Sequence, residues 1–245
     1  MQDDLDRPVA LASKAALPKY VRISERLIRE IAAGRLADGT RLPPEREMAV
    51  ELGASVGTLR KALADLADKG LLERIQGSGN YVRQRPEAAS VYAFFRLERP
   101  EGGGLPTALL LSVKTMAKPA DIPAFGTSPM GHRIRRLRML DDEVVALEEI
   151  WLDGGCAKRI VAEDLSESLY LYYRDALGLV VSRVEDRIGM ETVPDWADDR
   201  FAPMAGTPCA HIERLSWAGD GPAIEYSRNW FDKDRTRYIC RMGRD

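Results

Sequence analysis

A short run of hydroxyl and basic residues near the amino terminus has the groups that bind phosphates and base edges of a nucleic acid. Ser55 and Thr58 precede Arg60 and Lys61, and Arg46 lies nine residues before Ser55. Arginine and lysine donate hydrogen bonds to phosphates and to guanine, and hydroxyl groups donate to phosphates. These residue types predict contact with DNA, provided that one element presents them on a common surface.

The surrounding sequence predicts a helix-turn-helix that would present them. Three leucines between residues 59 and 66 recur at the spacing of one helical face, so Arg60 and Lys61 should point away from the core. Ser55 is suited to cap the start of this helix, and Gly70 to end it in the left-handed conformation. A shorter helix precedes it across a glycine-containing turn, which is the order of a helix-turn-helix.

Residues 71–82 predict a β-hairpin whose tip carries Gly77 and Gly79. Such a tip can lie against phosphates or enter the minor groove. Each signal alone has another explanation, namely two packed core helices, a solvated basic face or an ordinary glycine turn. Their occurrence in this order within residues 45–82 favours DNA binding.

Residues 17–85 resemble the winged helix-turn-helix of GntR-family transcriptional regulators. The resemblance implies that Arg46, Arg60 and Gly77 contact DNA. At Val56 many family members carry a basic residue that reads guanine, so that contact does not transfer, and a valine there can instead touch a thymine methyl group. The shared motifs are Pro18-x-Tyr20, Ile31-x-x-Gly34-x-Leu36-x-x-Gly39-x-x-Leu42-Pro43-x-Glu45-Arg46-Glu47, Ser55-x-x-Thr58-Leu59-Arg60-x-Ala62-Leu63 and Gly77-x-Gly79-x-x-Val82.

The second half of the chain carries another candidate chemistry, with four arginines between residues 133 and 138. On a strand, alternation places Arg136 and Arg138 on one face and Arg133 and Arg135 on the other. Arginines held by a rigid sheet can bind a carboxylate or phosphate with two hydrogen bonds. The alternative is a charged strand edge that prevents aggregation.

Strand-like patterns fill most of the second half and predict an α+β domain built on an antiparallel sheet. A loop is expected over 118–129 and a turn at 141–143, because both are rich in turn-forming residues. Helices are expected over 164–177, ended by Gly178, and over 197–204. The expected strands are 91–97, 109–113, 132–140, 144–152, 182–192, 209–217 and 223–231.

Residues 106–240 resemble the UTRA effector domain of HutC-type GntR regulators, which is similar in fold to chorismate lyase. The matching pieces are Arg136-Leu137-Arg138, Glu148 to Trp151, Asp164-Leu165-x-x-Ser168-Leu169-Tyr170, Leu177-Gly178, Glu185 and Gly221 to Ser227. UTRA domains bind small, often anionic, metabolites, so the resemblance implies that Arg136 and Arg138 clamp an effector anion. Ser168 and Tyr170 would add hydroxyl groups, and Glu225 would accept hydrogen bonds from effector hydroxyl or amine groups. The alternatives are capping and core packing for Ser168 and Tyr170, and a surface ion pair for Glu225.

Composition sets further bounds on the class of protein. The net charge is −2, yet residues 17–85 hold 13 Lys and Arg against 9 Asp and Glu, whereas residues 86–245 hold 21 against 26. The basic excess therefore lies in the predicted DNA-binding part. Three scattered cysteines and two histidines predict neither a disulfide framework nor a metal site, and no cofactor is expected. No apolar run approaches a membrane span, and the acidic amino terminus is unlike a signal peptide, so a cytoplasmic location is expected.

We therefore expect a mobile arm over 1–16, a winged helix-turn-helix over 17–85, a linker and first strand over 86–105, and a ligand-binding and dimerisation domain over 106–240. The expected function is that of a ligand-responsive homodimeric regulator, a repressor that a small-molecule effector releases from a palindromic DNA operator. The alternatives are a chorismate-lyase-like enzyme fused to a DNA-binding domain, and a DNA-binding dimer without a ligand. Adjacent carboxylates on strands point to opposite faces, so no acid–base pair is evident and an enzyme is not expected.

Overall fold

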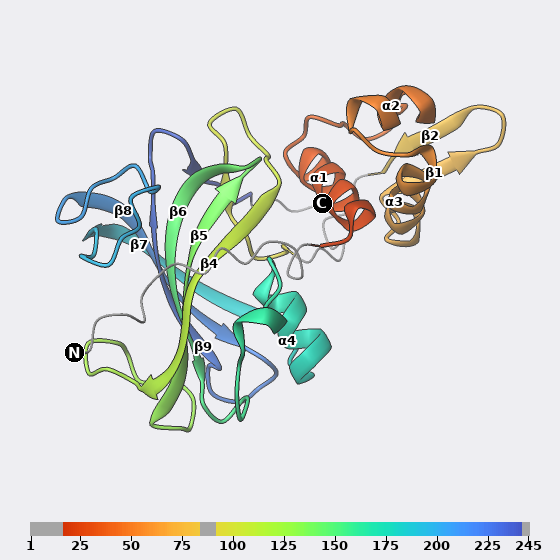
Figure 1. The fold of residues 1–245 in the computed structure, drawn as a ribbon. Coiled ribbons are helices and arrows are strands. Elements are labelled where there is room, and N and C mark those ends of the chain that lie inside the picture. Colours follow the sequence, from red (N-terminus) through yellow and green to blue (C-terminus); the bar gives the residue numbers. More distant parts are fainter. Residues whose placement is uncertain (1–16, 84–91, 242–245) are drawn as a thin grey trace. The chain divides into compact units, whose positions relative to one another are not determined.

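The computed structural model describes residues 17–83 and 92–241, which divide into two compact units (Figure 1). One unit comprises Leu17–Leu105 together with the chain from Tyr238, and the other comprises Pro106–Arg237. The expected arm over 1–16 and the start of the expected linker, up to residue 91, lie outside the described residues.

The first unit contains the helix-turn-helix and hairpin that the sequence predicts. Its elements are α1 (Lys19–Ala32), α2 (Glu45–Glu51), α3 (Val56–Asp68), β1 (Leu72–Ile75) and β2 (Gly79–Val82). The Thr58 N–H donates to Ser55 Oγ at 3.1 Å and caps α3, and Gly70 follows the helix with a φ of 72°. The core of this unit joins the buried faces of all three helices to the hairpin through Ile28, Ile31, Met48, Leu59, Leu63, Leu66, Leu72 and Val82.

Segments from beyond the hairpin complete the first unit. The Arg29 guanidinium on α1 donates to the carbonyls of Leu97 at 2.7 Å and Gly104 at 2.6 Å. Burial lowers the pKa of Arg29 to about 10, against the opposing charge of Glu98. Glu98 in turn accepts hydrogen bonds from the Arg241 guanidinium and from the Gly103 N–H. This cluster ties α1 to the chain after residue 92 and to the carboxy-terminal segment.

The predicted strand over 91–97 is mostly wrong. Residues 92–94 form a turn, which the Phe95 N–H closes by donating to the Tyr92 carbonyl at 2.8 Å. The Tyr92 and Phe95 rings pack edge to face with their centroids 6.4 Å apart, and the Arg29 guanidinium lies over the Phe95 ring. Only a short strand remains, β3 (Leu97–Glu98), which pairs with β10 (Arg237–Tyr238).

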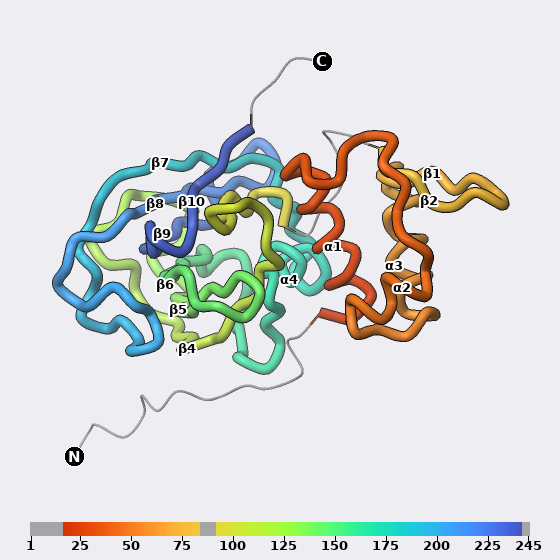
Figure 2. The backbone as a smooth tube through the Cα atoms, turned by 90° about the horizontal axis from the view of Figure 1, so that it is seen from above, coloured from red at the N-terminus to blue at the C-terminus, as the bar shows by residue number. Residues whose placement is uncertain are grey.

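The second unit is a six-stranded antiparallel sheet in the order β4-β5-β6-β9-β8-β7 (Figures 1 and 2). Apolar residues of α4 (Leu169–Leu177) and of the segment before it pack on one face, against Ile134, Ile150 and Leu152. The opposite face carries two other apolar clusters, one around Trp230 and one around Trp151. The strands are β4 (Pro106–Ala117), β5 (Met130–Leu140), β6 (Glu143–Asp153), β7 (Arg183–Thr192), β8 (Pro208–Trp217) and β9 (Glu225–Phe231).

Both predicted helices of the second unit need correction. The helix expected over 164–177 begins only at Leu169, because Leu165 is extended and Ser168 forms the cap by accepting from the Leu171 N–H. A single 3-10 turn, η1 (Ala162–Asp164), precedes it. Residues 197–204 form turns and no helix, and Asp198 there accepts from the Arg200 N–H at 3.0 Å, a local bond that competes with helix formation. No helix in the described part of the chain is long and apolar enough to cross a membrane.

Candidate DNA-binding surface and effector site

The start of α3 presents hydroxyl and basic groups to the outside of the first unit. Ser55 and Arg60 are exposed, and Ser55 Oγ lies 2.8 Å from Thr58 Oγ1. Arg60 Nε lies 2.7 Å from Glu45, an exposed pair that a phosphate can displace at low cost. The Lys61 ammonium lies 4.1 Å above the Tyr20 ring. The surface therefore offers donors at the end of a helix whose free N–H groups also favour anions.

Two other residues of the predicted surface differ in their exposure. Arg46 is exposed on α2, whereas Val56 packs partly against the apolar core of the first unit. The Val56 side chain is therefore only partly available to a thymine methyl group.

The hairpin tip brings a cation that sequence reasoning missed. Gly77 and Gly79 have φ values of 76° and 137°, which glycine adopts most readily. A Cβ at Gly79 would lie 3.2 Å from Arg41 Nε, and Arg41 pairs with Tyr81 in an isolated bridge. The exposed Arg41 guanidinium thus lies beside the hairpin, and its place within the Gly39-to-Leu42 motif was the available signal.

The sheet brings Arg136 and Arg138 together on the face covered by α4, as strand alternation predicts. Both are buried, with 6% and 4% exposure, and both contact one carboxylate, Glu148 on β6. Arg136 Nε lies 2.6 Å from Glu148 Oε2, and Arg138 donates to both Glu148 oxygens at 3.2 Å. Each guanidinium also donates to the Glu167 carbonyl at 3.3 Å, one residue before the cap of α4.

Burial and neighbouring charges shift the pKa values of Glu148 and Arg136. Burial opposes ionisation of Glu148, but Arg136 and Arg138 outweigh it and hold the pKa of this carboxyl below its usual value. Burial and the neighbouring Arg138 lower the pKa of Arg136. Two guanidinium groups thus contact one carboxylate in a buried position beside a helix amino terminus, and the more distant Glu225 also acts on Arg136. Such a pair of arginines can bind an added anion.

A second polar group on the same face surrounds Glu225. This side chain has 2% exposure, so a surface ion pair is ruled out. Tyr173 donates to it at 2.6 Å, Ser216 at 3.0 Å and Tyr170 at 3.2 Å. Burial raises the pKa of Glu225 despite these donors. Tyr170 therefore binds protein groups in this structure, and Ser168, 3% exposed, caps α4.

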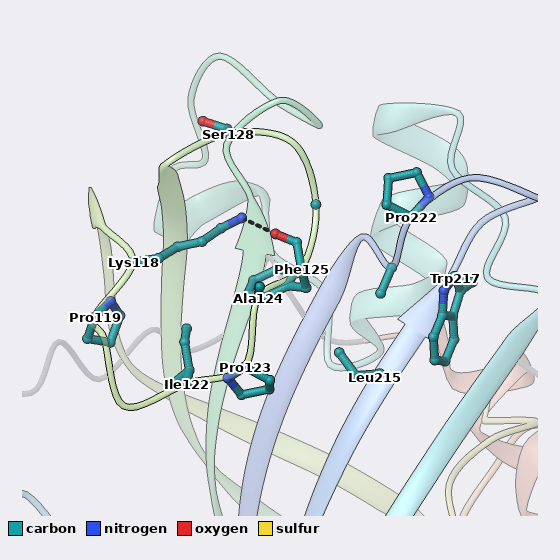
Figure 3. Close-up of a pocket in the computed structure, with 12 residues that line it drawn as sticks. Lys118, Pro119, Ile122, Pro123, Ala124, Phe125, Ser128, Leu215, Trp217 and Pro222 are labelled. Carbon is teal, nitrogen blue, oxygen red and sulfur yellow. Dashed lines mark hydrogen bonds between the residues drawn. The ribbon is translucent and has the colours of Figure 1, made fainter.

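Cavities lie on both faces of the sheet. Near Arg136 the space is only about 30 Å³, between β4, β5 and residues 162–169, which is room for a water molecule but not for a metabolite. A larger cavity of about 480 Å³ lies on the other face, between the 118–128 loop and the ends of β8 and β9 (Figure 3). Prolines and the Phe125 and Trp217 rings line much of it, and the Lys118 ammonium there is held by Asp153 and the Phe125 carbonyl.

Sequence reasoning missed Glu148, Tyr173 and Ser216 as members of the site. Glu148 stands in the sequence only as part of a family motif, and its place beside Arg136 and Arg138 follows from the β5–β6 register. The α4 spacing that puts Tyr170 and Tyr173 on one side of the helix was readable, but their shared partner was not. Within the ranges that the structure describes, no three His, Cys, Asp or Glu residues gather as a metal site.

Family comparisons agree with this architecture. Residues 19–82 match the model of the bacterial regulatory proteins of the gntR family, and residues 101–237 match the UTRA domain. The chain is a member of the GntR family. Its UTRA domain and relatives make it a DNA-binding, ligand-responsive transcription regulator of the HutC type.

The chain matches three curated relatives over nearly the full length of each one. The chain is 57% identical to the HTH-type transcriptional regulator SmoD of Agrobacterium fabrum, covering 93% of this chain and 97% of SmoD. It is 25% identical to the HTH-type transcriptional repressor NagR of Bacillus subtilis, covering 94% and 97%. It is also 25% identical to the mannosyl-D-glycerate transport/metabolism system repressor MngR of Escherichia coli, covering 90% and 94%.

Solved structures share the fold. The ligand-binding domain of a putative GntR-family regulator from Bordetella bronchiseptica has a TM-score of 0.53 at 18% identity, covering 66% of this chain and all of that one. YydK from Bacillus subtilis, a possible transcriptional regulator, has a TM-score of 0.51 at 18% identity, covering 93% and 100%.

Proposed function

We propose that this GntR regulator is a homodimeric repressor, and that a small hydroxylated organic anion releases it from a palindromic operator. The α4 face of the sheet holds the observation that carries the proposal, two buried arginines that share one carboxylate. Two relatives are named repressors, and one of them serves a system for mannosyl-D-glycerate, a glycoside that bears a carboxylate. A glycoside or sugar derivative with one anionic group is therefore the proposed effector class.

The arginine cluster would bind the anionic group of the effector, and the polar group around Glu225 would bind its hydroxyl groups. Arg136 and Arg138 would hold the anion with two-pronged hydrogen bonds, which carboxylate, sulfonate and phosphate groups all accept. Ser168 would add a hydroxyl at the start of α4. Glu225 and Tyr170 would exchange their present mutual hydrogen bond for bonds to the effector's hydroxyl groups, so that few buried polar groups stay unpaired.

Binding has to open the site, because the space beside Arg136 is too small for such a molecule. The Glu167 carbonyl holds residues 162–169 against both arginines by hydrogen bonds of 3.3 Å. An anion that takes over those guanidinium donors would free this segment. The effector would then favour an open form over the closed one, and this difference in affinity is what allostery requires.

On the DNA side, Arg60, Lys61, Arg46 and the Gly77–Gly79 tip would contact one half-site. Two copies related by a two-fold axis would place two α3 helices in successive major grooves of a palindrome. Because the operator is chromosomal DNA, the bacterial cytoplasm is where the protein would act.

The test separates the two activities. Fluorescence anisotropy with DNA from the protein's own promoter region measures operator binding, and calorimetry with a panel of anionic glycosides, sugar acids and sugar phosphates measures effector binding. We expect Arg60→Ala to weaken operator binding and leave effector affinity unchanged, and Arg136→Gln to do the reverse. Loss of both activities in either variant, or a panel without one compound that releases DNA, would contradict the proposal.

A further inference from the structure

The cavity of about 480 Å³ has no part in the proposed function. The strand register places Leu215, which lines it, on the opposite face of the sheet from Arg136. Residues 118–128 border the cavity on one side, and Trp217 and Pro222 border it on the other (Figure 3). Sites for small molecules usually measure about 300–1,000 Å³, so this cavity is large enough to be a second binding site.

The Asp153 carboxylate fixes the loop that forms the first side. It is 3% exposed and accepts hydrogen bonds from the Lys118 ammonium and, at 3.1 Å each, from the N–H groups of Ser128 and Gly155. Gly126 packs directly on it, because its φ is 64° and a Cβ there would overlap the carboxyl group. The donors outweigh burial and hold the pKa of Asp153 below its usual value. The protein itself therefore holds the loop, and the cavity is preformed.

Aromatic rings give the cavity flat apolar sides. The Phe125 ring lies 3.9 Å from the Lys118 ammonium, and the Trp217 ring lies 3.8 Å from the Arg183 guanidinium. Cation–π contacts of this kind help to hold a ring in one orientation. Three prolines, two alanines, Ile122 and Leu215 complete the apolar lining. A flat, apolar molecule would bury its faces against such a lining.

Lys118 supplies a hydrogen-bond donor to the cavity. An ammonium group carries three N–H donors, and two of them bind Asp153 and, at 2.7 Å, the Phe125 carbonyl. The third is available to an acceptor in the cavity. Among the described residues of the lining Lys118 alone is charged, and Asp153 neutralises it. An ion would enter without a partner of opposite charge, which is costly, so the lining favours a neutral molecule.

We propose that this cavity is a second small-molecule site, which takes a neutral, flat, largely apolar molecule with one acceptor, such as an aromatic ketone or amide. The ring would lie against Trp217, and the carbonyl oxygen would accept from Lys118. This class differs from the hydroxylated anion of the proposed function, whose hydroxyl groups would find few partners in this lining. The inference stands independently of that function, because the cavity uses none of the polar residues of the α4 face.

The experiment uses the full chain labelled with fluorotryptophan, whose indole signals are followed by fluorine NMR, and Trp217→Phe assigns the Trp217 signal. The probe is acetophenone, which we expect to shift that signal saturably. Two compounds of similar shape are compared with it, since ethylbenzene lacks the acceptor and benzoate carries a charge. Each should bind about tenfold more weakly than acetophenone. Equal affinity of either compound would overturn the proposed ligand chemistry.

A matched pair of substitutions tests the location. Ala124→Phe fills the cavity from an exposed position in its lining and should abolish the response to acetophenone. Ala120→Phe changes an exposed residue of the same loop outside the lining and should preserve the response. Neither alanine belongs to the Lys118–Asp153 pair, so folding should survive, which circular dichroism checks. Equal effects of the two variants would refute the site.

Arg136→Gln separates this site from the effector site. The substitution should weaken effector binding, as proposed above, and leave the response of Trp217 to acetophenone unchanged. A response lost in Arg136→Gln would show that acetophenone acts from the α4 face, and it would overturn the second site. A saturable response in a protein that binds no anion would support the second site while removing the proposed effector class.

Discussion

Replacing Glu148 by glutamine should destabilise the second unit strongly. The carboxylate lies 2.6 Å from Arg136 Nε and 3.2 Å from Arg138 Nη2, and all three residues have 6% exposure or less. Removing one partner of a buried ion pair leaves uncompensated charge and costs about 3–5 kcal/mol. A domain of this size loses about 3–4 °C of melting temperature per kcal/mol, so the expected loss is about 10–20 °C.

The neighbouring residue supplies a matched control. Glu149 points to the other face of the sheet and also carries two arginines, Arg135 at 2.7 Å and Arg228. These arginines are 19% and 22% exposed, so water compensates part of the charge that Glu149→Gln would leave. We expect a smaller loss, below about 3 kcal/mol, because partly exposed ion pairs contribute less than buried ones.

The assay is scanning calorimetry of both variants with sodium sulfate and with sodium chloride at equal ionic strength. The first unit should melt as in the wild type. Sulfate should stabilise Glu148→Gln more than Glu149→Gln, since a ligand at 100 times its dissociation constant adds about 2.7 kcal/mol. If Glu148→Gln were no less stable than Glu149→Gln, or if sulfate raised both transitions equally, the α4-face arginines would not form an anion site.

Three further substitutions probe other parts of the chain. Arg60→Ala should reduce the slope of log affinity against log salt by about 1 if Arg60 binds a phosphate, and an unchanged slope in anisotropy titrations would remove that contact. Burial raises the pKa of Glu225 above 4.5, so its contribution to stability is present at low pH and lost as pH rises through the folded value. Melting curves should therefore show Glu225→Gln gaining on the wild type with rising pH, and a gap independent of pH would contradict this. Arg29→Met should cost the first unit about 2–4 kcal/mol by leaving the Leu97 and Gly104 carbonyls without their donor, and a denaturant titration that shows less than 1 kcal/mol would refute the role of this cluster.

The helix-turn-helix was predictable because its signals are local. Ser55 caps α3 through a bond three residues away, and Gly70 ends it through a backbone conformation that glycine adopts freely. The leucine spacing between 59 and 66 marks the buried face without reference to any other element. Each of these features is decided within one turn of helix, so the sequence alone carries it.

Errors occurred where distant contacts decide the local structure. The aromatic run after residue 91 has strand composition, yet Arg29 and the Tyr92–Phe95 pair hold it in a turn. The predicted helix over 164–177 starts five residues before α4, because residues 164–168 have a helical composition. Their path instead follows the sheet, where the Glu167 carbonyl meets two arginines that lie about thirty residues earlier in the chain.

Strand alternation places the adjacent glutamates of β6 on opposite faces of the sheet, but it does not predict which face binds an anion. Glu148 and Glu149 have the same chemistry, and each meets two arginines, so the sequence pattern is symmetric between the two faces. The difference arises from what covers each face. On one side α4 and the chain before it exclude water, place a helix amino terminus nearby and add the hydroxyl groups of Tyr170 and Tyr173, which lie beside that of Ser216 on β8. On the other side the arginines reach solvent and pair with exposed carboxylates such as Asp121. Since electrostatic interactions strengthen as water is excluded, an anion has most to gain on the α4 face, and the covering segment rather than the strand sequence selects the site.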